Sequence, residues 1–227
     1  MKFLLDSIYP RLCHFCKTPW DGYLCDTCSK SIPRVECPRC ERCGEPFEGN
    51  ISTTFLCPNC HGIQLDFDFA IANMKNHPKS RQLVQDFKYG KQHHLATTLA
   101  KRCLETIQTD TRFADCREHP NEWLLCPVPL HWRRKMKRTF NQSELIAIEL
   151  SKLSHIPWKN LLCRTKYTGT QTRLSRDKRL QNIQSSITLN KRLSMTYTPS
   201  VILIDDVFTT GSTAQACAQI LKKHGKV

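Results

Sequence analysis

Four short pairs of cysteines near the N-terminus restrict the fold of this chain more than any other feature. The chain has 14 cysteines in 227 residues, and nine of them lie within the first 60 residues. Two residues separate the members of each pair, and such a knuckle can place two sulfurs on one metal ion. Because two knuckles supply the four thiolates of a tetrahedral structural zinc site, four pairs predict two zinc ions. The expected ligands are Cys13, Cys16, Cys25, Cys28, Cys40, Cys43, Cys57 and Cys60.

Spacing alone leaves the arrangement of these pairs open. They can join sequentially or interleave, and a single zinc ion with the other cysteines free is an alternative. Cys37 is expected to be spare, because Gly44 follows Cys43 and glycine favours the tight turn of a knuckle. His14 and His61 lie beside ligand cysteines and could replace one of them. The N-terminus has no signal-peptide pattern, so metal binding is favoured over disulfide bonds.

The composition changes near residue 62, which predicts two domains. Residues 1–62 form a cysteine-rich zinc-binding module, and residues 63–227 form an α/β domain in which strands and helices alternate. The run V-I-L-I is typical of a strand buried on both faces in a parallel sheet. Expected strands lie at 67–74, 123–130 and 201–204, and expected helices at 81–89, 94–107, 141–153 and 213–225.

The stretch V-I-L-I-D-D-V-F-T-T-G-S-T, residues 201–213, predicts a ligand site. Its strand would carry Asp205 and Asp206 to the carboxyl edge of a parallel sheet, where ligands bind in open α/β folds. The following loop leads into a helix N-terminus, which suits phosphate. Its expected phosphate ligands are Thr209, Thr210, Gly211, Ser212 and Thr213.

Carboxylates repel phosphate but suit sugar hydroxyls or a divalent cation. A ligand that satisfies both halves of the segment is a ribose 5-phosphate. The structural alternative is that the two acids begin a turn and Thr213 caps the helix. The chain has neither a Walker A loop nor a G-x-G-x-x-G motif after a strand, which argues against those nucleotide-binding folds.

The chain is strongly basic, with a net charge of +14, and this favours anionic partners. Five of the six residues from 133 to 138 are Lys or Arg. These cations could neutralise pyrophosphate or follow a nucleic-acid backbone, with Trp132, Phe140 or Tyr167 available to stack on bases. A solvated surface is the alternative. The candidate cations are Arg133, Arg134, Lys137, Arg138, Arg176, Lys178 and Arg179.

Residues 201–213 resemble the phosphoribosyl pyrophosphate (PRPP) motif of type I phosphoribosyltransferases. Within that superfamily the chain resembles the ComF family, which is associated with competence and natural DNA uptake. The paired cysteines carry this likeness together with three further blocks, at 86–90 (D-F-K-Y-G), 126–142 and 168–183. The resemblance implies a type I phosphoribosyltransferase-like parallel sheet flanked by helices, with a small cysteine-rich zinc-ribbon module before it.

The resemblance also implies roles for residues. Asp205 and Asp206 would be catalytic, bind the ribose hydroxyls and help to place Mg²⁺, while 209–213 would hold the 5-phosphate. The turn around Leu130 and His131 matches the pyrophosphate loop, and 164–183 matches the mobile loop that closes over PRPP.

The chain departs from the family pattern at two places. Thr139 stands where the family usually has glycine, and this could stiffen the turn. The chain ends at Val227, where the family usually has another strand, so truncation and a shorter sheet are both open expectations.

These features predict a competence-associated protein that binds PRPP and single-stranded DNA during natural transformation. The alternative is an active phosphoribosyltransferase of nucleobase or amine salvage without a DNA role, and the acceptor substrate is open. No apolar run approaches the length of a membrane span, so we expect a cytoplasmic protein that is not an integral membrane protein. The expected partner is the competence DNA-translocation machinery at the inner membrane, where the chain could lie peripherally.

Overall fold

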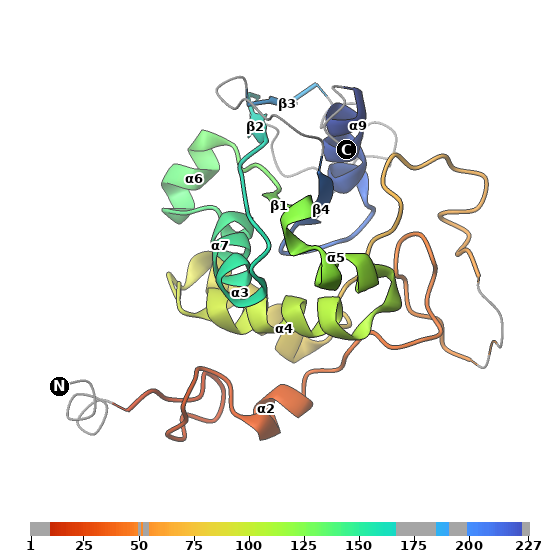
Figure 1. The fold of residues 1–227 in the computed structure, drawn as a ribbon. Coiled ribbons are helices and arrows are strands. Elements are labelled where there is room, and N and C mark those ends of the chain that lie inside the picture. The colour runs from red at the N-terminus through yellow and green to blue at the C-terminus, as the bar shows by residue number, and fades with distance from the viewer. Residues whose placement is uncertain (1–9, 50, 52–54, 167–184, 191–198, 224–227) are drawn as a thin grey trace.

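The computed structural model describes residues 10–49, 51, 55–166, 185–190 and 199–223. These residues form an α/β structure with the cysteine-rich segment at one side (Figure 1). Its helices are α2 (Asp26–Lys30), α3 (Pro78–Tyr89), α4 (Leu95–Thr109), α5 (Ala114–Glu118), α6 (Trp132–Arg138), α7 (Gln142–Ser154) and α9 (Ser212–Lys223). Its strands are β1 (Trp123–Pro127), β2 (Leu162–Arg164), β3 (Ile187–Leu189) and β4 (Ser200–Ile204). Two short 3₁₀ turns, η1 (Thr111–Phe113) and η2 (Pro120–Glu122), precede β1.

The parallel pairing of β1 with β4 confirms the predicted sheet type. Leu125 pairs with Ile202 and Pro127 with Ile204, so both strands end at the same edge. A second, antiparallel pair, β2 with β3, was not predicted. The carboxyl edge of β1 and β4 is where the predicted ligand residues begin.

Helices cover both faces of the β1–β4 pair (Figure 1). Alternate side chains of a strand point to opposite faces. Leu125 and Ile204 accordingly join the core with α4 and α7, whereas Leu124 and Cys126 join the core with α9. Residues 201–203 are only half-buried, because a cavity of about 450 Å³ runs along the strand over residues 199–205.

The prediction of a strand at 67–74 is wrong. Its backbone groups bond to the cysteine-rich segment instead of to a sheet. The Ala70 N–H donates to the Arg42 carbonyl at 2.7 Å, and the Val35 N–H donates to the Asn73 carbonyl at 3.1 Å. Alternating apolar residues at 67–71 indicated a strand, but partners distant in sequence decide where such a segment bonds.

The main helices were predicted, with differences at their ends. Helix α3 begins at Pro78 rather than at residue 81, because proline is accepted in the first helical turn and His77 caps it by accepting the Lys79 N–H at 3.3 Å. The predicted end of the last helix at Gly225 lies outside the described residues. Helix α6, which carries the basic cluster, was not predicted as a helix.

The cysteine-rich segment packs against α3 and α4. Ile32 is 1% exposed and belongs to the same core as Leu83 and Phe87. Arg102 of α4 is also buried and donates to the Ser29 carbonyl at 2.7 Å. The predicted division at residue 62 therefore falls between two parts of the chain that share a core.

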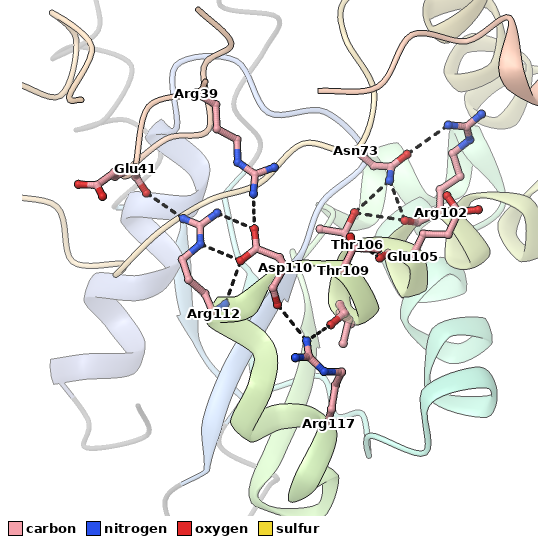
Figure 2. A network of polar contacts seen from close by, with 11 residues as sticks. Arg39, Glu41, Asn73, Arg102, Glu105, Thr106, Thr109, Asp110, Arg112 and Arg117 are labelled. Carbon is pink, nitrogen blue, oxygen red and sulfur yellow. Dashed lines mark hydrogen bonds and ion pairs between the residues drawn. The ribbon is translucent and has the colours of Figure 1, made fainter. Parts of the chain in front are cut away.

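A cluster of ionic contacts joins the second half of the cysteine-rich segment to the end of α4. Figure 2 shows Arg39 and Arg112 converging on the carboxylate of Asp110. Burial of this carboxyl group raises its pKa, but the hydrogen bonds and charges of the two guanidinium groups outweigh that effect and lower the pKa overall. Arg112 also donates to the Glu41 carbonyl at 3.1 Å, so this network holds the segment from two sides.

We predict that Asp110→Asn lowers the free energy of unfolding by about 2 kcal/mol at pH 7, since it leaves two partly buried guanidinium groups without their carboxylate. A lowered folded-state pKa stabilises the protein above the unfolded pKa of about 3.9, and this contribution disappears as the pH falls through the folded pKa. Urea denaturation should therefore show a smaller difference between variant and wild type at pH 3 than at pH 7. The control is Asp21→Asn, whose carboxylate is fully exposed. An Asp110 effect that is equal at both pH values would contradict this account.

Candidate functional site

The eight predicted ligand cysteines form two compact clusters. The sulfurs of Cys13, Cys16, Cys25 and Cys28 lie within 4.8 Å of one another, and so do those of Cys40, Cys43, Cys57 and Cys60. The knuckles are therefore joined sequentially, which spacing could not decide. Cys37 is exposed and belongs to neither cluster, as predicted. The imidazole of His14 contacts Asp86 instead of a cluster.

The chemistry of the clusters fits structural zinc. Backbone N–H groups donate to the sulfurs, from Cys25 to Cys13 at 3.4 Å and from Cys57 to Cys40 at 3.3 Å, and such bonds stabilise thiolates. A hydrogen bond from Thr18 lowers the pKa of Cys16 to about 6. Burial and the neighbouring thiols raise the pKa of Cys28 to about 12. Four sulfurs this close repel one another as thiolates, and a bound divalent cation removes that repulsion.

We predict two zinc ions per chain, measured by elemental analysis of purified protein. Cys28→Ser should reduce the ratio to one, because it removes a ligand of the first cluster only. Cys37→Ser is the matched control and should keep two. A ratio of two in Cys28→Ser, or a loss of zinc in Cys37→Ser, would contradict the assignment.

The two predicted acids lie at the carboxyl edge of the parallel pair. Asp205 and Asp206 follow Ile204, whose carbonyl accepts the Val128 N–H at 2.9 Å, so the ends of β4 and β1 are held together. Although part of Asp205 is exposed, protein packed around its carboxyl group raises its pKa to about 7, and the charge of Asp206 adds to this rise. The raised pKa reduces the negative charge of the pair near neutral pH, which weakens its repulsion of an anionic ligand.

Lys88 is a charged residue at this edge that was not predicted. Its Nζ lies 2.8 Å from Oδ1 of Asp206, and both side chains are largely buried, at 16% and 13% exposed. Helix α3 positions this lysine in its last turn. The sequence feature that could have indicated Lys88 is the D-F-K-Y-G block, which contains this residue.

The predicted phosphate loop leads directly into α9. Gly211 has φ of +71°, and a Cβ there would lie 2.9 Å from the ring of Phe208, so only glycine fits without strain. The hydroxyl groups of Thr210 and Ser212 lie 2.9 Å apart on either side of it. Helix α9 begins at Ser212, close to the predicted start, and its first N–H groups lie at this loop.

The turn after β1 lies at the same edge. The Asn141 side chain donates to the Val128 carbonyl at 3.1 Å, and His131 caps α6 by accepting the Arg133 N–H at 3.3 Å. Ser143, at the start of α7, lies 3.5 Å from the Asp205 carboxylate. The structure therefore places the predicted pyrophosphate turn beside the acidic pair.

Helix α6 carries four of the predicted cations, Arg133, Arg134, Lys137 and Arg138. Desolvation lowers the pKa of the partly buried Arg164. The charges of Arg134 and Asp205 both act on this guanidinium group, so it couples α6 electrostatically to the acidic edge. Thr139 ends α6 with φ of +72°, a left-handed conformation that glycine, the residue expected here from the family resemblance, would adopt more readily. The other three predicted cations, Arg176, Lys178 and Arg179, lie outside the described residues.

Two exposed aromatic rings accompany these cations. Trp132 is 56% exposed beneath the Arg133 guanidinium, and Tyr89 is 65% exposed beneath that of Arg138, at 5.3 and 5.1 Å from the ring centres. The stacking role expected for Phe140 is wrong, because this ring is buried in the core against Phe87. Tyr167 lies outside the described residues.

None of the helices within the described ranges combines the length and apolar character needed to cross a bilayer. The double zinc ribbon domain family matches residues 4–61. Competence protein F of Haemophilus influenzae is 32% identical over 89% of this chain and 85% of its own length. DNA utilization protein YhgH of Escherichia coli is 28% identical over 95% of this chain and 92% of its own length. Competence protein ComFC of Bacillus subtilis is 22% identical over 91% of this chain and 80% of its own length.

These three matches extend over about nine-tenths of the chain or more. The chain therefore belongs to the competence protein F family, and its N-terminal part is a double zinc ribbon.

Proposed function

We propose that this chain binds PRPP with Mg²⁺ at the carboxyl edge of β1 and β4, and binds single-stranded DNA along α6, during natural transformation. One observation carries the first half of the proposal. Asp205 and Asp206 lie between the turn after β1 and the hydroxyl-rich loop that begins α9. The second half is supported by the relatives, which are named as competence and DNA utilization proteins.

The two halves of residues 201–213 suit different parts of PRPP. Carboxylate oxygens bind ribose hydroxyls and are ligands that Mg²⁺ prefers, so Asp205 and Asp206 are the residues that would hold the cation. Bound Mg²⁺ would neutralise part of the pyrophosphate charge. The N–H groups at the start of α9, with the hydroxyls of 209–213, suit the 5-phosphate.

Transfer of the ribosyl group would depend on position and charge. As the bond between the anomeric carbon and pyrophosphate breaks, positive charge would develop at that carbon and negative charge on pyrophosphate. A nitrogen of the acceptor base or amine would form the new bond to the anomeric carbon. The turn around His131 and the cations of α6 would stabilise the leaving group. A salvage phosphoribosyltransferase without a DNA role is the second candidate, and it is supported by the position of the predicted pyrophosphate turn beside the acidic pair.

We predict that wild-type protein binds PRPP in calorimetry only when Mg²⁺ is present. Asp205→Asn combined with Asp206→Asn should abolish this binding, because both carboxylate ligands are lost. The control is Asp115→Asn, which changes a carboxylate on α5 that accepts a hydrogen bond from Trp123. Undiminished binding in the double variant would sink the PRPP assignment.

We predict that single-stranded oligonucleotides bind with an affinity that falls steeply with salt, measured by fluorescence anisotropy. Arg133→Ala with Lys137→Ala should flatten the slope of log K against log salt by about 1.4, since each lost phosphate contact removes about 0.7. Trp132→Ala should weaken binding by about 1–3 kcal/mol without changing the slope, because stacking releases no counterions.

Lys101→Ala, an exposed change on α4, is the control for overall charge. Salt-independent binding by the wild type would contradict a DNA role and favour the salvage enzyme. In the DNA-uptake hypothesis the chain lies in the cytoplasm beside the translocation machinery at the inner membrane.

A further inference from the structure

The first zinc ribbon is the part of the chain around Cys13, Cys16, Cys25 and Cys28, and the second is the part around Cys40, Cys43, Cys57 and Cys60. We propose that the first ribbon is part of the ligand site, because it positions Lys88 against the acidic pair through a contact between His14 and Asp86. This inference rests on the proposed binding of a phosphorylated ribose at Asp205 and Asp206. It assigns Lys88 as a ligand-binding cation and His14 as a positioning residue.

The first step is the place of His14 in the ribbon. It follows Cys13, a ligand of the first cluster, and its backbone N–H donates to the Tyr23 carbonyl at 2.7 Å. Its imidazole is 5% exposed, and the ring of Phe15 packs edge-on against it at 5.1 Å. The knuckle around the first metal therefore determines where this imidazole lies.

The second step is the contact with α3. Nε2 of His14 lies 2.9 Å from Oδ2 of Asp86. Asp86 and Lys88 are two positions apart on the last turn of the helix, so their side chains leave it in nearly opposite directions. Between them Phe87 is fully buried in the core and fastens the turn. One face of this turn is thus held by the ribbon, and the other faces the acidic edge.

The third step is the ion pair at the site. Lys88 and Asp206 are largely buried, so their attraction is less screened than that of a surface pair. A phosphorylated ribose would enter beside two acids, and a fixed cation offsets their charge. Because the Lys88 side chain is largely buried, surrounding atoms restrict its conformations, and the position of α3 determines whether Nζ reaches the acidic edge.

A double-mutant cycle tests the link. Magnesium–PRPP affinity is measured by calorimetry in zinc-loaded wild type, His14→Ala, Lys88→Ala and the double variant. We expect each single change to weaken binding by about tenfold, because each would remove the equivalent of one charge-assisted hydrogen bond between Lys88 and the ligand. The double variant should bind no more weakly than Lys88→Ala alone. Multiplying effects would show that His14 acts independently of Lys88 and would overturn the proposal.

The second ribbon provides the matched control. Arg39→Ala removes its contact with Asp110 but leaves Arg112 in place (Figure 2), so the fold is retained. This change should leave PRPP affinity unaltered. Asp86→Asn repeats the test with a side chain of nearly the same shape if His14→Ala folds poorly. A loss of affinity in Arg39→Ala equal to that in His14→Ala would reduce the effect to general destabilisation and contradict a special role for the first ribbon.

A readout without PRPP separates this inference from the proposed function. Hydrogen exchange followed by mass spectrometry reports on peptides that cover 86–90 and 201–208. His14→Ala should speed exchange in both peptides, and Arg39→Ala in neither. If wild type fails to bind PRPP but the two variants show these exchange changes, the proposed function fails and the coupling between the first ribbon and the acidic edge stands. Unchanged exchange at 201–208 in His14→Ala overturns the coupling whatever the ligand.

Discussion

The parallel pairing of β1 with β4 is the constraint on which the ligand site depends. Because parallel strands end at a common edge, the turn around His131 and the acids Asp205 and Asp206 meet although they are far apart in the chain. The bond from Val128 to Ile204 extends that pairing past the last residue of β1. Helices on both faces bury the pair, so the edge is where polar groups can gather.

The zinc ribbons depend on a different kind of energy. Their apolar side chains are few, and metal binding is the natural source of their stability. Each ribbon nevertheless contacts the α/β part through a carboxylate. The first ribbon contacts the partly exposed Asp86, and the second contacts the buried Asp110. The first contact lies on the helix turn that carries Lys88, whereas the second lies at the C-terminal end of α4. We therefore expect only the first ribbon to influence the ligand site.

Prediction from sequence succeeded where a pattern is local. The C-x-x-C spacing and the apolar run before Asp205 each signal their structure within a few residues, and Gly211 has the positive φ that its loop requires. The strand predicted at 67–74 is absent, because the backbone of this segment forms hydrogen bonds to the cysteine-rich segment. The stacking role predicted for Phe140 is wrong, because its ring is buried in the core. In both cases residues distant in the chain decide the outcome.

The sequence by itself determined two cysteine clusters, an α/β core with a parallel sheet, and an acidic pair followed by a hydroxyl loop, because these follow from spacing and periodicity. Only the tertiary structure decided which knuckles lie together in one cluster. It also decided that Lys88 reaches Asp206, and that Tyr89 lies exposed beneath Arg138. These pairings join residues far apart in the chain, and no short pattern encodes a contact that forms only when separate elements pack together.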